Sequence, residues 1–164
     1  MWRGTSPGGV VHVMRSDDGE LWAKHSGEWI RFATMVVGPA DAEDLLTTAF
    51  LAATSSPGWP EVTNRRAYLF RSVANHAHKH RRAYARRLDR ELRAVTPEVE
   101  PDETSRTAVL VALLRLTTRQ RAVVWLTYWL DLAQADVADT LGISQRTVER
   151  ELEHARTRLK GLLS

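Results

Sequence analysis

Residues 133–163 read AQADVADTLGISQRTVERELEHARTRLKGLL, a run with the pattern of two helices that meet at a tight corner. Gly142 stands where the C-terminus of a helix favours a left-handed residue, and Ser144 suits the cap of the next helix. In that next helix, apolar residues recur at steps of four, three, four and three, which predicts one buried face. They are Val148, Leu152, Ala155, Leu159 and Leu162. The run therefore predicts a helix-turn-helix, a motif that places a helix in the DNA major groove.

With that face turned inward, the polar residues of the second helix are expected to face solvent. Gln145 and Arg146, at its start, are residue types that read base edges, whereas Arg150 and Arg158 are suited to hold phosphates. The alternative is an ordinary helical hairpin with a salt-bridged surface. The candidate duplex-binding residues are Arg119, Ser144, Gln145, Arg146, Thr147, Arg150, Glu151, His154 and Arg158.

Charge is distributed unevenly along the rest of the chain. The net charge is only +3, yet residues 65–93 carry nine Arg and one Lys against two acids. Residues 94–105 carry four acids and no base. A run of like charge is often just a solvated helix face, but this excess of bases favours a nucleic-acid surface. The acidic stretch, interrupted by Pro97 and Pro101, is expected to be a linker.

Apolar periodicity predicts helices throughout. They cover residues 20–37, 41 to about 54, 64–93, 106–116, 119–130, 134–141 and 145–163. The segment 119–130 is so apolar that it is expected at the centre of its domain. The predicted fold is all-α, with two small helical domains: a tail at 1–19, a first domain at 20–93, a linker at 94–105 and a second domain at 106–164.

The sequence gives little support to catalysis or metal binding. The chain has no cysteine, which excludes disulfides, thiolate metal sites and a cysteine nucleophile. The acids Asp41, Glu43 and Asp44 have no histidine in a matching helical frame and suit the first turn of a helix. Of His76, His78 and His80, the middle one points away from the other two, so three-ligand metal binding is geometrically poor. No enzyme activity, metal or cofactor is therefore expected. Nor is a signal peptide or membrane span, so the expected location is the cytoplasm, in association with the nucleoid.

Taken together, the motifs resemble the small extracytoplasmic-function group of bacterial RNA polymerase sigma factors. Residues 38–46, GPADAEDLL, with Phe50 and Leu51, resemble the segment of region two that binds core polymerase. Residues 66–71, RAYLFR, with Asn75, Arg81 and Arg82, resemble the helix that captures the −10 element. Residues 116–121, LTTRQR, and the helix-turn-helix resemble region four, which reads the −35 element.

The resemblance implies an alternative sigma factor that binds core RNA polymerase and directs promoter-specific initiation. Its implied partners are core polymerase, duplex −35 DNA, the melted non-template strand at −10 and, as often in this family, an anti-sigma factor. The implied polymerase contacts are Asp41, Glu43, Asp44, Leu45 and Leu46. The implied −10 contacts are Trp59, Arg66, Tyr68, Arg71, Asn75, Lys79, Arg81 and Arg82.

Two other functions, and the role of two aromatic residues, stay open at this point. The chain could be a stand-alone helix-turn-helix regulator that dimerises through its first domain, or a metal-dependent nuclease built on Asp41, Glu43 and Asp44. Trp59 and Tyr68 could stack on unpaired bases or could cap the hydrophobic core.

Among the departures from the family pattern, two fall in the helix-turn-helix. Ala133 stands where Ser or Thr usually caps a helix. Glu149 and Glu151 stand where Lys and Arg are frequent, and carboxylates repel phosphate. This predicts a different −35 sequence or weak −35 affinity.

Overall fold

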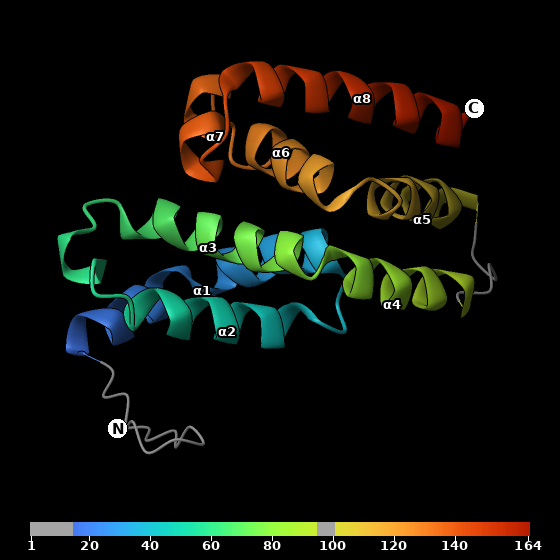
Figure 1. The fold of residues 1–164 in the computed structure, drawn as a ribbon. Coiled ribbons are helices and arrows are strands. Elements are labelled where there is room, and N and C mark those ends of the chain that lie inside the picture. The colour runs from blue at the N-terminus through green and yellow to red at the C-terminus, as the bar shows by residue number, and fades with distance from the viewer. Residues whose placement is uncertain (1–14, 95–100) are drawn as a thin grey trace.

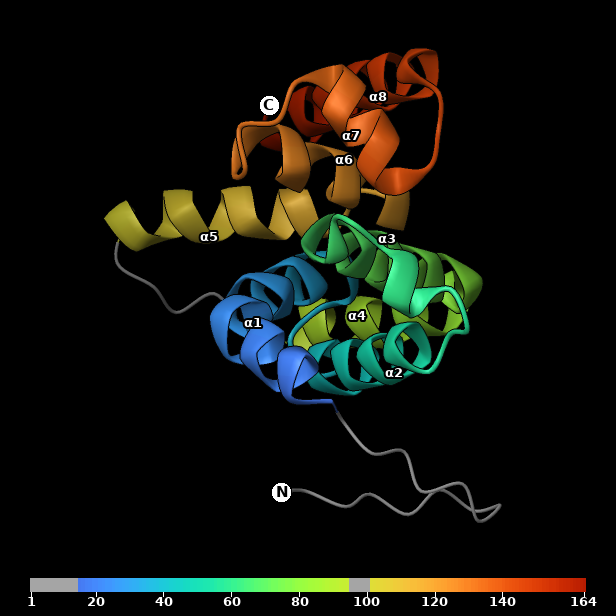
Figure 2. The ribbon, with the colours of Figure 1, turned by 90° about the vertical axis from the view of Figure 1, so that its left-hand side faces the viewer.

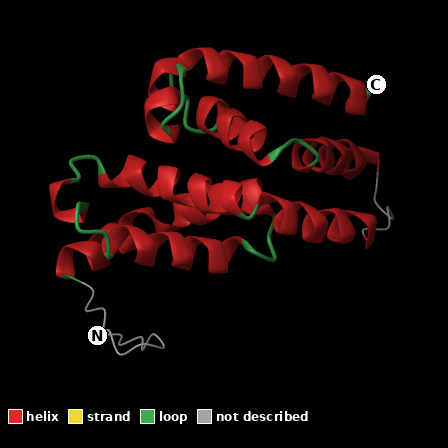
Figure 3. Cartoon of the chain, in the orientation of Figure 1, coloured by secondary structure: helices red, strands yellow, loops and turns green. Residues whose placement is uncertain are grey.

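The computed structural model describes residues 15–94 and 101–164. Every regular element in that part of the chain is a helix (Figure 3), which confirms the predicted all-α class. The α-helices are α1 (Ser16–Val37), α2 (Ala42–Thr54), α3 (Arg65–Lys79), α4 (Arg81–Ala94), α5 (Pro101–Leu114), α6 (Thr118–Tyr128), α7 (Gln134–Leu141) and α8 (Gln145–Leu163), with a 3₁₀ turn at Trp59–Glu61.

The helices form two layers. Helices α1–α4 make one, here called the N-terminal half, and α5–α8 make the other, here called the C-terminal half (Figures 1 and 2). Helices α1 and α3 lie directly under α6, and α3 also contacts α7. The surface of α3 that carries the predicted −10 residues is therefore next to the helix-turn-helix.

The N-terminal half is held by aromatic packing and one buried polar pair. Trp29 lies 6.2 Å from Phe50 between ring centroids, and Trp22 meets Phe50 edge-on at 4.8 Å. The indole N–H of Trp59 donates to Asp18 Oδ1 at 2.9 Å, deep in the protein. A buried donor needs such an acceptor, so this bond fixes the Trp59 turn against the first turn of α1.

The predicted single helix at 64–93 is wrong. It breaks at His80, whose φ of −110° and ψ of 20° end α3, and α4 starts at Arg81. The side chain of Arg81 donates to the carbonyl of His78 at 3.1 Å, one of the last carbonyls of α3. The break lets Leu88 of α4 pack closely over Gly38 at the end of α1. Neither Gly nor Pro occurs at this position, so the sequence contains no residue that would have indicated a helix break.

Two predicted boundaries also move. Helix α5 starts at Pro101, inside the predicted linker 94–105, because proline is well tolerated in the first turn of a helix. Helix α1 starts at Ser16, inside the predicted tail 1–19. The rest of that tail, up to residue 14, and residues 95–100 of the linker lie outside the described residues.

The helix-turn-helix forms as its sequence predicts. Gly142 adopts the left-handed conformation with φ of 66°, and Ser144 Oγ accepts from the Thr147 N–H at 3.1 Å to cap α8. Val148, Leu152 and Ala155 are buried as predicted and Leu159 is half-buried. The prediction is wrong for Leu162, which is 43% exposed in the last turn of α8. Ala133 leaves the start of α7 without a side-chain cap, as expected from its methyl group.

Helix α6 is central, but only in part. Val123 to Leu126 are buried, whereas the predicted central residues Tyr128 and Trp129 are 56% and 63% exposed. The helix ends at Tyr128, and Trp129 follows as its C-cap, so both rings lie beyond the packed face. An all-apolar segment has no periodicity to reveal where its burial stops.

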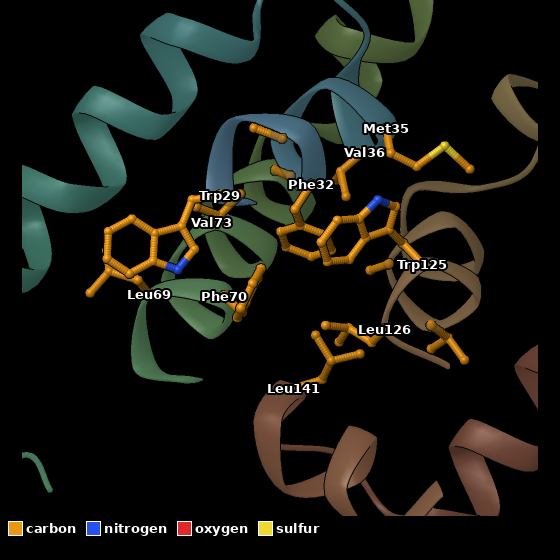
Figure 4. Close-up of a cluster of buried hydrophobic side chains, with 14 of the residues drawn as sticks. Trp29, Phe32, Met35, Val36, Leu69, Phe70, Val73, Trp125, Leu126 and Leu141 are labelled. Atoms are coloured by element: carbon orange, nitrogen blue, oxygen red, sulfur yellow. The ribbon is translucent and has the colours of Figure 1, made fainter. Parts of the chain in front are cut away.

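One hydrophobic core serves both halves, which the two-domain prediction did not anticipate. Trp125 of α6 packs against Phe32 of α1 at 5.3 Å and Phe70 of α3 at 5.8 Å, while these two rings lie 5.2 Å apart. Figure 4 shows the three rings meeting between the layers, with Leu126 and Leu141 below them. Aromatic contacts of this kind stabilise beyond the area they bury.

Candidate nucleic-acid and polymerase interface

Helix α8 presents a mixed strip to solvent. Gln145, Arg146, Arg150 and His154 are exposed, as the sequence predicts. Glu149 shares the strip, where it accepts a bond from Gln145 at 3.5 Å. The face can therefore offer donors to base edges, but its acids oppose phosphate contact.

Other predicted −35 residues are less accessible. Thr147 is half-buried, and its hydroxyl group is hydrogen-bonded to the hydroxyl of the capping residue Ser144, with 2.8 Å between the two oxygens. Glu151 is half-buried beside Arg150, 3.6 Å away, so it does not share the exposed strip. Glu153, which was not among the predicted residues, does, because it lies four residues after Glu149 on the same side of α8. Helical spacing alone could have identified it.

Arg119 and Arg158 lie away from this strip. Arg119, at the start of α6, lines a cavity of about 200 Å³ with Gly142 and Ile143 of the corner and with Asn75 and His78 of α3. Arg158 lines a groove of about 410 Å³ among α4, α5, α6 and α8. The predicted −35 set is thus divided among three places.

Tyr68, Arg71 and Asn75 come together at a hollow of about 370 Å³ between α2 and α3. The hollow is also lined by Ser56 and Ser72, and Ser72 donates to the carbonyl of Ala49 at 3.0 Å. Residues spaced three to four apart share one face of α3, and the loop after α2 closes the hollow. Three of the predicted −10 residues therefore form one surface.

Trp59 is not part of that surface. Its ring is 1% exposed, its N–H is bonded to Asp18, and Arg65 stacks on it at 4.9 Å. It supports Tyr68, whose ring meets it edge-on at 5.7 Å. Of the two roles considered, the geometry favours a core cap for Trp59, while half-buried Tyr68 keeps an accessible side.

Arg66 is held within the N-terminal half. Its guanidinium forms a two-bond pair with Glu28 and lies 5.5 Å from the centre of the Phe70 ring. The hydrogen bond from Arg66 lowers the pKa of Glu28 below its usual value, against the effect of burial. Such a pair resembles an Arg–phosphate contact, but in this structure its partner is a carboxylate.

Arg71 is held by the opposite half of the molecule. Its Nε donates to the carbonyl of Thr140 at 3.2 Å, and its Nη2 donates to the carbonyl of Asp139. Both carbonyls lie in the last turn of α7. The remaining predicted −10 bases, Lys79, Arg81 and Arg82, are exposed.

The acidic segment at the start of α2 is only partly available. Glu43 and Asp44 are exposed, whereas Asp41 pairs with Arg87 of α4 at 2.9 Å. Leu45 and Leu46 are each 2% exposed and belong to the core. In this structure the accessible part of the predicted polymerase-binding segment is therefore two carboxylates.

Arg121 was missed as a contact between the halves. Its guanidinium is buried and donates to the carbonyl of Val36 at 3.1 Å (Nε) and 2.6 Å (Nη2), and to the carbonyls of Leu114 at 2.8 Å and Leu116. Burial lowers its pKa to about 10. The residue lies in the LTTRQR motif, but no local signal indicates that its partner is 85 residues away.

The described residues offer neither a metal cluster nor a membrane span. No group of three or more His, Asp or Glu side chains is placed to hold a metal ion. No helix in residues 15–94 and 101–164 is both long and apolar enough to cross a membrane.

Comparison with known proteins adds the family. Residues 106–159 match the family model for sigma-70, region 4. The chain is 31% identical over 134 residues to an RNA polymerase sigma-E factor of Streptomyces avermitilis, covering 77% of this chain and 73% of that protein. It is also 31% identical over 145 residues to the ECF RNA polymerase sigma factor SigL of Mycobacterium tuberculosis, covering 82% of each. The chain belongs to the extracytoplasmic-function sigma factors.

Solved structures agree with this assignment. CnrH, solved in complex with the cytosolic domain of CnrY, is 25% identical with a TM-score of 0.60, over 89% of this chain and 86% of that one. RpoE of Bartonella quintana, solved with the anti-sigma factor NepR, has a TM-score of 0.65 at 20% identity over 91% of this chain and 98% of that one, and shows the shared fold. Membership in the sigma factors decides against the stand-alone regulator considered from the sequence.

Proposed function

We propose that this sigma factor divides promoter reading between its two halves. The N-terminal half binds core RNA polymerase and the melted −10 strand, and the C-terminal half reads the −35 duplex through α8. The observation that carries this proposal is the hollow where Tyr68, Arg71 and Asn75 meet, in a chain whose other half is a capped helix-turn-helix. The protein acts as an initiation factor without chemistry of its own, at the nucleoid.

At the −10 element, a melted base would enter the hollow between α2 and α3. Tyr68 supplies a ring face, and Asn75 supplies an amide that can both donate and accept. Flipping a base costs a few kcal/mol. The exposed bases of the α3–α4 junction, Lys79 to Arg82, would offset that cost through phosphate contacts.

At the −35 element, Gln145, Arg146 and Arg150 would enter the major groove. Glu149 and Glu153 share the exposed face, and their carboxylates can accept hydrogen bonds from base amino groups such as N4 of cytosine. The exposed face of α8 would thus help to select the −35 sequence while adding little to the affinity for DNA.

Polymerase binding rests on Glu43 and Asp44. They are the exposed acids at the start of α2, next to Thr47, Thr48 and Leu51 on the outer side of that helix. Leu45 and Leu46 would support this surface from the core without touching the partner.

Run-off transcription with core polymerase and a promoter library tests the whole proposal. The wild-type chain should support specific transcripts, and Asn75→Ala should reduce them at every promoter, because it removes contacts without disturbing the core. Asp44→Lys should lower the affinity for core polymerase, while Glu20→Lys, an equal charge change on exposed α1, should not. Absence of transcripts from the wild-type chain would contradict the proposal.

Salt dependence tests the phosphate contacts. Arg82→Ala should reduce the slope of log affinity against log salt by about one unit, because Arg82 is exposed and unpaired with any acid in the described residues. Arg87→Ala should change it less, because Arg87 already pairs with Asp41. Equal slopes for both variants and the wild type would mean that neither residue contacts phosphate.

A further inference from the structure

Promoter geometry requires the two halves to separate. The −10 and −35 elements lie about 25 base pairs apart, which is about 85 Å of duplex at about 3.4 Å per base pair. A compact chain of 164 residues has a radius of gyration of about 15 Å, so it spans roughly 40 Å. The shared core seen here therefore cannot persist while both elements are bound. The closed arrangement is a separate state with contacts of its own.

The contacts of α7 with α3 fall on the −10 surface. Arg71 donates to the carbonyls of Asp139 and Thr140 in the last turn of α7, where the Asp139 carbonyl also accepts from the N–H of Gly142 at 3.4 Å. The C-terminal end of a helix carries a partial negative charge, so it attracts a guanidinium. A pair of oxygens in front of the guanidinium fork is also the arrangement that a phosphate offers.

The helix-turn-helix corner leaves room for this contact. A Cβ added to Gly142 would lie 3.3 Å from both Cζ and Nε of Arg71, so any larger residue would press on the guanidinium. Gly142 thus has two roles, since its φ of 66° makes the corner and its missing side chain admits Arg71.

Charge complementarity surrounds this contact. A cavity of about 560 Å³ is lined by two bases, Arg66 and Arg71, and one acid, Glu61, from the N-terminal half, and by the acids Asp136 and Asp139 from α7. The acids of α7 therefore face the bases that the −10 strand would use. Helix α8, in contrast, keeps its exposed strip free of the other half.

We propose that the C-terminal end of α7 substitutes for a promoter phosphate at Arg71, so that the closed chain masks its own −10 surface. Single-stranded DNA and α7 then compete for the same guanidinium, while α8 stays accessible. This inference rests on the proposed role of Arg71 in −10 binding. Since a competent state that is rarely populated weakens apparent affinity in proportion, variants that favour opening should bind single-stranded DNA more tightly.

The test combines a distance measurement with DNA binding. The chain has no cysteine, so Thr48→Cys and Thr157→Cys, both at exposed positions on opposite layers, place two spin labels on the full chain. The wild-type background should give one short distance, and an excess of short single-stranded DNA of mixed sequence should shift it to longer values. Fluorescence anisotropy with the same DNA gives the affinity.

Two kinds of variant weaken the mask from the α7 side. Asp136→Lys with Asp139→Lys reverses the charge that faces Arg66 and Arg71, and Gly142→Asn crowds Arg71 without changing the charge while tolerating a left-handed backbone. Both should lengthen the distance and tighten single-stranded DNA binding by about tenfold. The matched control, Glu149→Lys with Glu153→Lys on α8, adds equal charge and should leave the distance unchanged.

The results separate this inference from the function. If the wild-type chain binds single-stranded DNA tightly without a change in distance, or if the α7 variants bind no more tightly than the α8 control, the mask is refuted. Transcription with core polymerase could still succeed in that case. If the wild-type chain gives no transcripts, the proposed function fails, whatever the distances show.

Discussion

Helices α3 and α8 are the two proposed DNA-reading helices, and the fold treats them differently. Helix α8 packs on α6, α7 and α5 of its own half and leaves a polar strip in solvent. Helix α3 packs on α1 and α2 of its own half and also on α6 and α7 of the other half, so Arg71 is bound to carbonyls 68 and 69 residues away. The comparison shows that the residues of a DNA-binding helix can be identified from the local sequence. Whether that helix is accessible depends on packing by parts of the chain far away in the sequence.

Trp125 gives the largest test of this comparison. Trp125→Ala removes a ring that both halves share and should lower the free energy of unfolding by about 3–5 kcal/mol. Urea denaturation followed by circular dichroism measures it. Trp129→Ala, at a 63% exposed site four residues later, should change stability by less than about 0.5 kcal/mol. A loss from Trp125→Ala as small as that expected for Trp129→Ala would mean that the shared core is not stabilising.

Arg121 tests the polar part of the same contact. Arg121→Met leaves the carbonyl of Val36 and those of Leu114 and Leu116 without their buried donor, which should cost about 3 kcal/mol. The loss should appear in thermal unfolding as a lower Tm. Arg115→Met, at an exposed site just before α6, is the control, and it should leave the Tm nearly unchanged. A lower Tm for Arg115→Met but not for Arg121→Met would mean that Arg121 does not stabilise the contact between the halves.

Helix caps test the local side of the comparison. Ser144→Ala removes the acceptor for the Thr147 N–H and should cost about 1 kcal/mol. Ala133→Ser should recover a similar amount at the start of α7, because the backbone of Ala133 already has a cap conformation without a side-chain bond. Chemical denaturation of the two single variants and the double variant measures both. The idea fails if Ala133→Ser destabilises the chain.

His78 gives the smallest effect and reports on the contact between the halves. Partial burial, then Arg119 of α6 and Arg81, lower the pKa of His78 below 6.5. The unfolded chain therefore takes up this proton first, so stability should fall as the pH drops from 6.5 to the lowered pKa and be unaffected by this residue at higher pH. In an NMR titration, Arg119→Gln should raise the pKa of His78. An unchanged value would indicate that Arg119 does not act on His78.

Much of the candidate site was accessible to sequence reasoning. Gln145, Arg146, Arg150 and His154 were placed on the exposed side of α8 from the spacing of Val148, Leu152 and Ala155. Tyr68, Arg71 and Asn75 do share one surface. Trp59 and Glu151 were placed less well, because burial of an aromatic ring or a carboxylate depends on what packs over it. Whether the selected residues contact promoter DNA and polymerase stays a prediction.

The sequence by itself determined the local features of this sigma factor: helix periodicity, the left-handed Gly142, the Ser144 cap and the order of the motifs, all of which depend on neighbours within a few residues. Tertiary structure decided the rest: the break at His80, the burial of Trp59, the Phe32–Phe70–Trp125 core, the buried Arg121 and the contact of Arg71 with α7. Each of these depends on partners tens of residues away along the chain. Their positions follow from how two layers of helices bury a common core, and no local pattern encodes that geometry.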